Sequence, residues 1–510
     1  MTSRAPDRRS AGDRWLLLAL CLAGFAWRLI GLDFQSLWRD ESDALLFAGR
    51  PWPELLRTFS RPGENGPLFF LALRPWLELA GRSEFALRFP SALAGVLAIP
   101  LTYVLARRLL RLTGAAHLAV SEPTLSNVPL LAGVLTAVNP YLAWYSQEGK
   151  MYAGLVVLIL GAHLAFLAAV EAAAQPGPRW LWRSAPWWLL YLVLLALAAL
   201  THVLAVLVVA VHGLWLLALG RRYRRAWLPL LGTLALPALP YYALVGWWQL
   251  RLFLDPRFQT GHPAVSLPTM AEAMVVGFTL GVAIPPSVLP LALAIFLLLA
   301  GLLLSGEGRR AAPRLSLMLA AWLAGPLLLL FAISLRKPMF TDRYLIWTLP
   351  AAAMTAAVGV AAVGRSWRRL GWAVLALLVG LGLAAGWRQT HTPIKSDFRA
   401  AAAHVRAHAQ PGDRLLFLIP HIRPTFEYYA GPQPDGVDGP YTNGGMTEAQ
   451  LAEEMARSLQ GASAVWLVAS EAELWDRRGL VRAWLEAHGQ VTHDRELTRV
   501  RVTRYALGPP

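Results

Sequence analysis

Residues 15–32 read WLLLALCLAGFAWRLIGL, and apolar runs of this kind decide the fold class. A helix needs about 20 predominantly apolar residues to cross a bilayer. Similar runs recur along the 510-residue chain, which is 56% hydrophobic and only 15% charged. That composition excludes an ordinary soluble protein. The sequence predicts a polytopic membrane protein, and the first run is expected to stay as an anchor because no small-x-small cleavage site follows it.

Arginine clusters orient the predicted spans. Most arginines flank the apolar runs, so the net charge of +16 fits topology control better than nucleic-acid binding. Arginine concentrates on the cytoplasmic side of membrane proteins, which places the tail 1–14 in the cytoplasm and the loop 33–87 outside. We expect a multi-pass cell-membrane protein with about 11 transmembrane helices, near residues 15–32, 88–106, 127–142, 152–173, 186–202, 203–220, 226–246, 287–304, 315–334, 343–364 and 370–387.

One apolar segment does not fit this series of spans. GPLFFLALRPWLELAG, residues 66–81, is short and carries Arg74, Pro75 and Glu78. If it crossed the membrane, the arginines at 107 and 108 would face outside, against the positive-inside rule. We therefore expect it to be a juxtamembrane helix along the outer interface.

The composition changes after residue 387, where a small α/β domain over 388–510 is predicted. DFRAAAAHVRAHAQ and AELWDRRGLVRAWLEAHG are typical of helices, whereas LLFLIP, SAVWLVAS and RVTRYAL are typical of strands. The span count places this domain outside the cytoplasm. It has neither GxGxxG nor a P-loop, so no nucleotide is assigned to it. A scaffold or acceptor-recognition role is the expectation.

Polar residues gather on segments that the span count brings to the outer face. SLWRDESD, residues 36–43, carries two adjacent acids after the first span. NPYLAWYSQEGKMYA, residues 139–153, joins two further spans, and TDRYLIWTLP begins a later one. Charged residues at such depth are costly and usually functional. The candidates are Asp40, Glu41, Arg88, Tyr145, Gln147, Glu148, Lys150, Arg343 and Tyr344.

Acids and bases beside a lipid surface suit transfer of a sugar from a lipid phosphate. Arginine and lysine hold and neutralise a phosphate leaving group. A carboxylate deprotonates the incoming hydroxyl or amine. A second acid orients the nucleophile, binds a divalent cation or raises the pKa of its neighbour. The sequence contains no closed set of metal ligands, so the need for a metal stays unknown.

Simpler interpretations of the same residues stay open. Asp40 and Glu41 are also explained as interfacial charge, and the tyrosines as an aromatic belt at the membrane surface. His202 and His212 lie on apolar helices, where satisfied core groups are expected rather than metal ligands. His262 has no HxxxH or HxH partner and is weak evidence for a metal site.

Four segments, in this order, resemble bacterial members of glycosyltransferase family 39. They are SLWRDESDALLFAGRPWPELL, GPLFFLALRPWLELAGRSEFALRFPSALAGVLAIPLTYVLARRL, NPYLAWYSQEGKMYAGLVVL and DRYLIWTLPAAAM. The family is related to protein O-mannosyltransferases and lipid A aminoarabinose transferases. The likeness is strongest over residues 30–175 and returns at 340–400, with YSQEGKMYA its most specific part. It implies an all-α GT-C membrane fold over 15–387, with outer juxtamembrane helices, followed by the C-terminal α/β domain.

The resemblance implies an inverting transfer of a mannose-like or other sugar from a polyprenyl-phosphate donor, on the extracytoplasmic side. It assigns the general base to Asp40, with Glu41 as its neighbour, and the acid of the second outer loop to Glu148. It places Arg88 near the donor phosphate, with Lys150 and Arg343 as further phosphate partners. The acceptor stays unknown, whether lipid, glycan or protein, and a protein acceptor is not claimed. Membrane lipids are expected around the protein, and the placement of the arginines leaves no nucleic acid as a partner.

One departure from the family bears on the donor. Many relatives have His-Pro-Pro where this chain reads Glu64-Asn65-Gly66-Pro67. Asn65 is therefore expected to replace the histidine in substrate binding, beside Tyr145, Gln147 and Tyr344. The identity of the sugar stays open for this reason.

Two other classes of protein share some of these features. A polar-lipid transporter or flippase would also have many spans and phosphate-binding cations, but transporters often show paired halves with broken helices, which this sequence lacks. A non-catalytic assembly protein would have no reason to gather acids, bases and aromatics on one face. Transport of a label across vesicles without transfer would favour the transporter.

Overall fold

The computed structural model describes residues 8–59, 66–115, 127–235, 247–258, 260–283 and 313–508. The chain forms two compact units that do not follow its order. The first is Met1–Ile30 with Ala48–Gln389, and the second is Gly31–Phe47 with Thr390–Pro510. The segment that carries Asp40 and Glu41 thus belongs to the same unit as the C-terminal residues.

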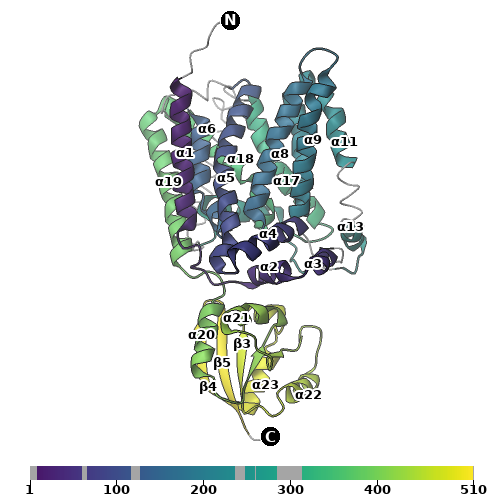
Figure 1. Ribbon diagram of the computed structural model, residues 1–510, viewed down its shortest axis with the longest axis vertical. Helices are drawn as coiled ribbons and strands as arrows, with labels where there is room; N and C mark the ends of the chain where they lie inside the picture. The colour runs from purple at the N-terminus through teal and green to yellow at the C-terminus, as the bar shows by residue number, and fades with distance from the viewer. Residues whose placement is uncertain are drawn as a thin grey trace. The chain divides into compact units, whose positions relative to one another are not determined.

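The first unit is a bundle of long helices lying side by side (Figure 1). Among the described residues, six helices are long and apolar enough to cross a membrane. A further pair, bent by 55°, makes a seventh if it counts as one span. The six are α5 (Glu84–Leu112), α8 (Tyr152–Ala173), α9 (Trp180–Thr201), α17 (Pro313–Ser334), η6 with α18 (Asp342–Arg365) and α19 (Arg368–His391), and the bent pair is α6 (Val128–Val138) with α7 (Pro140–Ser146).

The predicted number of about 11 spans is not confirmed. The first predicted span corresponds to α1 (Arg8–Leu29), which runs within the bundle but carries charges at both ends. The predicted span 203–220 corresponds to η2 (Val203–Leu207) and α10 (Val208–Leu219), which together form a shorter apolar helix. Only α11 (Trp227–Ala235) of the predicted span 226–246 is described, and the span 287–304 lies outside the described residues.

Shorter helices complete this unit. They are α3 (Trp52–Phe59), α4 (Pro67–Ala80), η3 (Arg221–Ala226), α13 (Trp247–Leu254) and α14 (Leu267–Leu280). The helix expected over residues 66–81 is present as α4, which runs across the long helices rather than along them (Figure 1). Gly66 precedes it with φ 74°, where a Cβ would lie 2.8 Å from the carbonyl oxygen of Thr201. A glycine is therefore required at this close approach.

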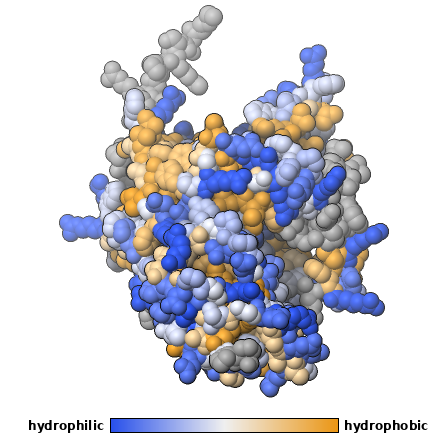
Figure 2. Space-filling model, turned by 60° about the horizontal axis from the view of Figure 1, so that its bottom comes forward, coloured by the Kyte–Doolittle hydropathy of each residue, from blue (hydrophilic) through white to orange (hydrophobic). Residues whose placement is uncertain are grey.

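Many large apolar side chains of the long helices are exposed, and Figure 2 shows orange patches on the face in view. Such extended apolar surface suits contact with lipid rather than water. Exposed examples on long helices are Leu16, Leu18 and Leu22 of α1, Leu93, Leu97 and Val104 of α5, Leu189 and Val193 of α9, and Leu377 and Leu383 of α19. The described helices therefore support a multi-pass membrane protein.

A buried arginine holds the bend between α6 and α7. Pro140 starts α7 and has no N–H, so carbonyl groups in the last turn of α6 lose their helical donors. The fully buried Arg28 of α1 donates to the carbonyl oxygen of Ala137 at 3.1 Å and to the Ser146 hydroxyl at 3.2 Å. It also donates to the Gly24 carbonyl oxygen at 3.0 Å. These bonds offset the cost of a charge inside an apolar bundle.

Gly95 lets α5 approach this arrangement closely. A Cβ at Gly95 would lie 1.9 Å from the Ser146 hydroxyl oxygen and 2.7 Å from the Arg28 Nε. We expect Gly95→Ala to displace one of these groups and to lower the stability by about 1–3 kcal/mol, as overpacking typically does. Thermal unfolding in detergent measures the effect. Gly154→Ala is the control, because a Cβ there meets nothing within 4 Å. Equal unfolding midpoints for the two variants would contradict this packing role.

The C-terminal part of the second unit is built on a five-stranded sheet in the order β2-β1-β3-β5-β4. β1 is parallel to β2 and β3, while β5 is antiparallel to β3 and β4. Phe417, Trp466, Val468 and Val502 are among the buried core residues. The elements are α20 (Phe398–His408), β1 (Asp413–Phe417), η7 (Pro420–Ile422), α21 (Arg423–Ala430), β2 (Val437–Asp438), α22 (Glu448–Ser458), β3 (Ala464–Ala469), η8 (Ala472–Leu474), α23 (Leu480–His488), β4 (Gly489–Leu497) and β5 (Val500–Leu507).

The domain differs from the prediction in several elements, since α21, β2 and α22 were not predicted, and two further differences have a clear physical cause. AELWDRRGLVRAWLEAHG is not one helix, because α23 begins only at Leu480. The Asp476 carboxylate accepts from the backbone N–H groups of Leu480 and Val481, and Gly479 has φ 68°, so the chain turns before the helix starts. β4 was not predicted, because this mostly exposed edge strand lacks apolar alternation.

A buried ion pair ties β1 to β5. The Asp413 carboxylate accepts from Arg504 Nε at 2.8 Å and Nη2 at 2.7 Å, and from the Trp466 indole N–H at 3.0 Å. The side chains of Asp413 and Arg504 are 4% and 8% exposed, respectively. Burial raises the pKa of the Asp413 carboxyl, but the hydrogen bonds from Arg504, Gln410 and Trp466 outweigh it and lower the pKa below the usual 3.8. The ionised pair therefore stabilises this sheet.

The pH dependence has a defined sign. Because the pKa of Asp413 is lowered in the folded state, its contribution is complete above about 3.8 and is lost as the pH falls below that value. We expect Asp413→Asn, which leaves Arg504 buried without its partner, to destabilise the sheet by about 3 kcal/mol at pH 7. The difference in stability between this variant and the wild type should shrink as the pH falls from 5 to about 2. Pepsin cleavage of β1 and β5 in the full chain at pH 2–5 measures this, and a difference that grows toward low pH would contradict it.

Candidate active site

The turn between α7 and α8, residues 147–151, is fixed against its neighbours in the first unit. The Gln147 amide donates to the carbonyl oxygens of Ile30 at 2.7 Å and Arg28 at 3.0 Å. A Cβ at Gly149 would come within 3 Å of the Leu87 side chain on α5, so the two segments touch. The Ser91 hydroxyl donates to the Lys150 carbonyl oxygen at 3.0 Å. The YSQEGKMYA segment is thus attached to the end of α1 and to the start of α5, where Arg88 lies.

Aromatic rings and charges converge beside this turn. The Tyr145 ring packs against Tyr141 and Tyr152, with centroids 4.8 and 5.2 Å apart. The charged groups of Glu148, Asp342 and Arg343 lie within electrostatic range of Tyr145. Residues from α7, the following turn and η6 (Asp342–Thr348) therefore meet at one place.

Two histidines extend the cluster along η6. The Tyr344 ring lies 4.7 Å from the His202 ring, and 6.1 Å from the His262 ring, between centroids. The Arg343 guanidinium lies 5.9 Å from the Tyr152 ring centroid. His202 follows α9 and His262 precedes α14, so four separated segments, 145–152, 202, 262 and 342–344, contribute to what we call the η6 cluster. Its members are Tyr145, Glu148, Tyr152, His202, His262, Asp342, Arg343 and Tyr344.

Electrostatics favour a neutral imidazole at His262. Burial lowers its pKa, and the nearby Arg343 charge lowers it further. At neutral pH this side chain therefore offers one donor and one acceptor rather than a positive charge. Arg343 remains the cation of the η6 cluster, which suits contact with an anion at Arg343 and with neutral hydroxyl groups at the histidine.

The structure brings together four of the predicted site residues, namely Tyr145, Glu148, Arg343 and Tyr344. Glu148 is 3% exposed, whereas Arg343 and Tyr344 are partly exposed. The other four members, Tyr152, His202, His262 and Asp342, were not predicted as site residues. Asp342 directly precedes Arg343 in TDRY, but nothing in the sequence pairs it with α7. The two histidines were not chosen because neither has the sequence spacing of metal ligands. They lie beside Tyr344 only in the folded structure.

The remaining predicted phosphate partners lie close to the same turn. Arg88 is fully buried on α5, next to Leu87, which meets Gly149. The Lys150 ammonium is 5.8 Å from the Phe70 ring centroid of α4, and its side chain is partly exposed. Asn65 lies outside the described residues. In the described part of the chain, no group of three or more His, Cys, Asp or Glu side chains is arranged to hold a metal.

Asp40 and Glu41 lie in the second unit, at the start of α2 (Arg39–Gly49), and differ in surroundings. The Glu41 side chain is fully buried and its Oε2 lies 3.0 Å from the Lys395 Nζ. The Asp40 side chain is 20% exposed, with its Oδ1 3.9 Å from the Arg39 Nε. Of the two adjacent acids, Glu41 is fully buried in an ion pair with Lys395, whereas the Asp40 side chain is partly exposed.

His212 is a satisfied core group of the bundle, as expected, because both of its ring nitrogens are hydrogen-bonded. His212 is hydrogen-bonded through Nε2 to His163 Nδ1 at 2.8 Å, and through Nδ1 to the Tyr191 hydroxyl at 2.8 Å. Trp215 and Trp322 pack against the His163 ring. This arrangement joins α8, α9 and α10 and has no place in the η6 cluster.

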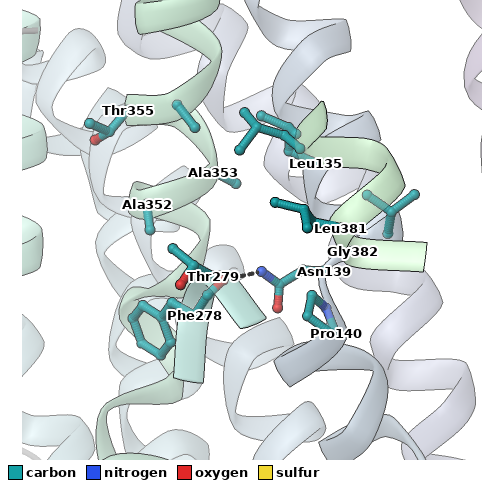
Figure 3. Close-up of a pocket in the computed structure, with 13 residues that line it drawn as sticks. Leu135, Asn139, Pro140, Phe278, Thr279, Ala352, Ala353, Thr355, Leu381 and Gly382 are labelled. Atoms are coloured by element: carbon teal, nitrogen blue, oxygen red, sulfur yellow. Dashed lines mark hydrogen bonds between the residues drawn. The ribbon is translucent and has the colours of Figure 1, made fainter. Parts of the chain in front are cut away.

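An apolar pocket lies among α6, α14, α18 and α19 (Figure 3). Its polar members are already hydrogen-bonded within the protein. The Asn139 amide donates to the Phe278 carbonyl oxygen at 2.7 Å, and the Thr279 and Thr355 hydroxyls donate to carbonyl oxygens of their own helices. The pocket therefore suits an apolar chain better than a charged sugar phosphate, and it contains none of the predicted site residues.

Comparison with known proteins rests on structure. No protein-family model and no curated protein matches the sequence. Among solved structures, ArnT from Cupriavidus metallidurans in the apo state matches with a TM-score of 0.60 and 16% identity, covering 98% of this chain and 100% of that one. The same protein bound to undecaprenyl phosphate matches with a TM-score of 0.56 and 14% identity, over 98% and 99% of the two chains.

The chain has the GT-C fold. The archaeal oligosaccharyltransferase AglB from Archaeoglobus fulgidus, in complex with an inhibitory peptide and a dolichol-phosphate, shares it. That match has a TM-score of 0.52 and 12% identity, and covers 99% of this chain and 75% of AglB. The GT-C fold that the sequence resemblance implied is thereby confirmed, and the matches to ArnT cover 98% of this chain.

Proposed function

We propose that this protein transfers a sugar from a polyprenyl-phosphate donor to an acceptor on the extracytoplasmic side of the membrane. The observation that carries the proposal is the η6 cluster, in which Arg343, two acids and several rings gather in a GT-C fold. The similar ArnT and AglB structures hold undecaprenyl phosphate and dolichol-phosphate, which supports a lipid phosphate as the donor carrier.

The proposed reaction is a single in-line displacement. The acceptor oxygen or nitrogen attacks the anomeric carbon while the bond from that carbon to the phosphate oxygen breaks. Polyprenyl phosphate leaves as an anion, and the configuration at the anomeric carbon is inverted. Arg343 and Lys150, both partly exposed, neutralise the leaving phosphate, because guanidinium and ammonium groups form strong charge-assisted hydrogen bonds to it. Arg88 supports them from its buried position on α5.

Asp40 is the proposed general base, which takes the proton that the acceptor loses as it attacks. Its partly exposed carboxylate can meet an acceptor, whereas the Glu41 carboxylate is buried against Lys395. Glu148 and Asp342 would instead balance the charge of Arg343 and orient the donor. Tyr344, with His202 and His262 beside it, offers a surface of rings and neutral hydrogen-bonding groups that suits a sugar.

Asp40→Asn tests the base. The substitution keeps the size of the side chain but removes the proton acceptor, so we expect turnover to fall by about 10²- to 10⁴-fold with folding and membrane insertion intact. Purified protein is offered a panel of polyprenyl-phosphate sugars with an acceptor extract, and release of polyprenyl phosphate is measured.

Glu54→Gln in α3 is the matched control, because it also neutralises an exposed acid of the loop 33–87. Normal turnover by Asp40→Asn would contradict the assignment. Transport of a labelled donor across vesicles, without release from any donor, would instead favour a polar-lipid transporter.

Arg343→Gln tests the phosphate contact. Loss of a charged hydrogen bond of about 1.5–3 kcal/mol is expected to lower kcat/KM for the donor by about 10- to 100-fold. The exposed Arg336 lies just before η6, so Arg336→Gln is the control for general loss of positive charge. Equal kinetics for both variants would remove Arg343 from the site.

A further inference from the structure

The carboxyl ends of the parallel strands β1 and β3 lie at the position where open α/β sheets commonly bind ligands. From β1 the chain passes through α21 to β2 on one side, and from β3 it continues to β4 and β5 on the other side. Connections that leave two adjacent parallel strands in opposite directions open a crevice at the carboxyl ends of those strands. Here the segments that follow β1 and β3 hold residues 36–42 of the same chain.

Hydrogen bonds attach this segment to α21, which follows β1. The backbone N–H of Leu37 donates to the Tyr429 hydroxyl at 2.7 Å. The Ser42 and Thr425 hydroxyls are 2.6 Å apart, and Thr425 is fully buried. On the β3 side, the Arg39 Nη1 lies 3.3 Å from the Glu471 Oε2. The two sides of the crevice thus hold the residues that flank Asp40.

A buried ion pair lies at the centre of these contacts. Lys395 joins α19 to α20 in sequence, and its Nζ is 3.0 Å from the Glu41 Oε2. The two side chains are 5% and 0% exposed. A buried pair adds little net stability, but loss of one partner leaves an uncompensated charge, so the pair strongly favours a single arrangement of the segment. Asp40 directly precedes Glu41 in the first turn of α2, so the ion pair also fixes the position of its backbone.

Further bonds extend the attachment toward the start of the segment. The Gln35 side chain donates to the Thr392 carbonyl oxygen at 2.8 Å, and its oxygen accepts from the N–H groups of Ile394 and Lys395 at 3.0 and 3.2 Å. The backbone N–H of Arg399 donates to the Ser36 hydroxyl at 3.2 Å. Residues 35–42 are therefore bound along their length by residues 390–429 and 471.

We propose that the C-terminal α/β domain positions the catalytic loop, and that Lys395 is a positioning residue that orients Asp40 through Glu41. The crevice at the carboxyl ends of β1 and β3 is occupied by a segment of the protein's own active site. This inference rests on the proposed function for the role of Asp40, whereas the attachment of residues 36–42 can be measured without any reaction.

The test compares Lys395→Met with Lys395→Arg in the full-length protein. Hydrogen–deuterium exchange of peptides that cover residues 36–47 is followed without substrate. Lys395→Met is expected to speed exchange at these amides at least 10-fold, because Glu41 loses its partner. Lys395→Arg keeps a cation and is expected to exchange at nearly the wild-type rate. Arg482→Gln, which breaks the exposed pair with Glu486, controls for general destabilisation and should leave residues 36–47 unchanged.

Kinetics supply the second measurement. Lys395→Met is expected to lower kcat at least 10-fold with little change in the donor KM, since the proposed phosphate-binding residues belong to the other unit. Lys395→Arg should restore most of the loss. Thr425→Val is the second variant, for the case that Lys395→Met does not fold. It removes the hydrogen bond to Ser42 without leaving a buried charge, so we expect a smaller increase in exchange and a smaller loss of kcat.

The outcomes separate the two proposals. Wild-type exchange at residues 36–47 in Lys395→Met and Thr425→Val would overturn the attachment. Faster exchange with unchanged kcat would overturn the positioning of Asp40. If the wild-type protein transfers no sugar, the proposed function fails, and the exchange rates alone decide whether the α/β domain holds the segment.

Discussion

The arrangement of the first unit depends on one set of bonds, those from Arg28 to the bend between α6 and α7. An apolar bundle has no water to satisfy carbonyl groups that a broken helix releases. Arg28 supplies the donors, and Gly95 leaves the room for its guanidinium and for Ser146. The bend sets the direction of α7, and α7 carries Tyr145 and leads into the turn with Glu148. The buried charge at the bend thus helps to place Tyr145 and Glu148, two members of the η6 cluster.

The two adjacent acids of SLWRDESD lie in different surroundings, and each can therefore have its own role. Glu41 forms a buried ion pair with Lys395, whereas the Asp40 side chain is partly exposed in the same unit. Under the proposed function, one acid performs the chemistry and the other holds it in place. This division gives the C-terminal α/β domain a task within the reaction, which composition and strand pattern alone left undefined.

Sequence patterns predicted the parts of this protein that depend on local or periodic signals. The apolar runs led to α5, α8, α9, α17, α18 and α19, and strand-like runs led to β1, β3 and β5. The family resemblance led to the GT-C fold, and the polar residues of the outer segments included four members of the η6 cluster. What the sequence did not reveal depends on tertiary contact. Lys395 is 354 positions from Glu41, and no spacing rule connects them. Arg28 within its span, and His202 and His262 beside Tyr344, gave no local signal of their partners. β4 was missed because an exposed edge strand needs no apolar alternation.

The most direct test of the account is the stereochemistry of the transfer. A polyprenyl-phosphate sugar of known anomeric configuration is incubated with the purified protein and an acceptor, and the product linkage is determined by NMR. A single displacement, with phosphate held at Arg343 and the acceptor deprotonated by Asp40, predicts an inverted anomeric carbon. Retention of configuration would require a covalent sugar intermediate and would contradict the account, as would intact donor recovered after prolonged incubation with folded protein.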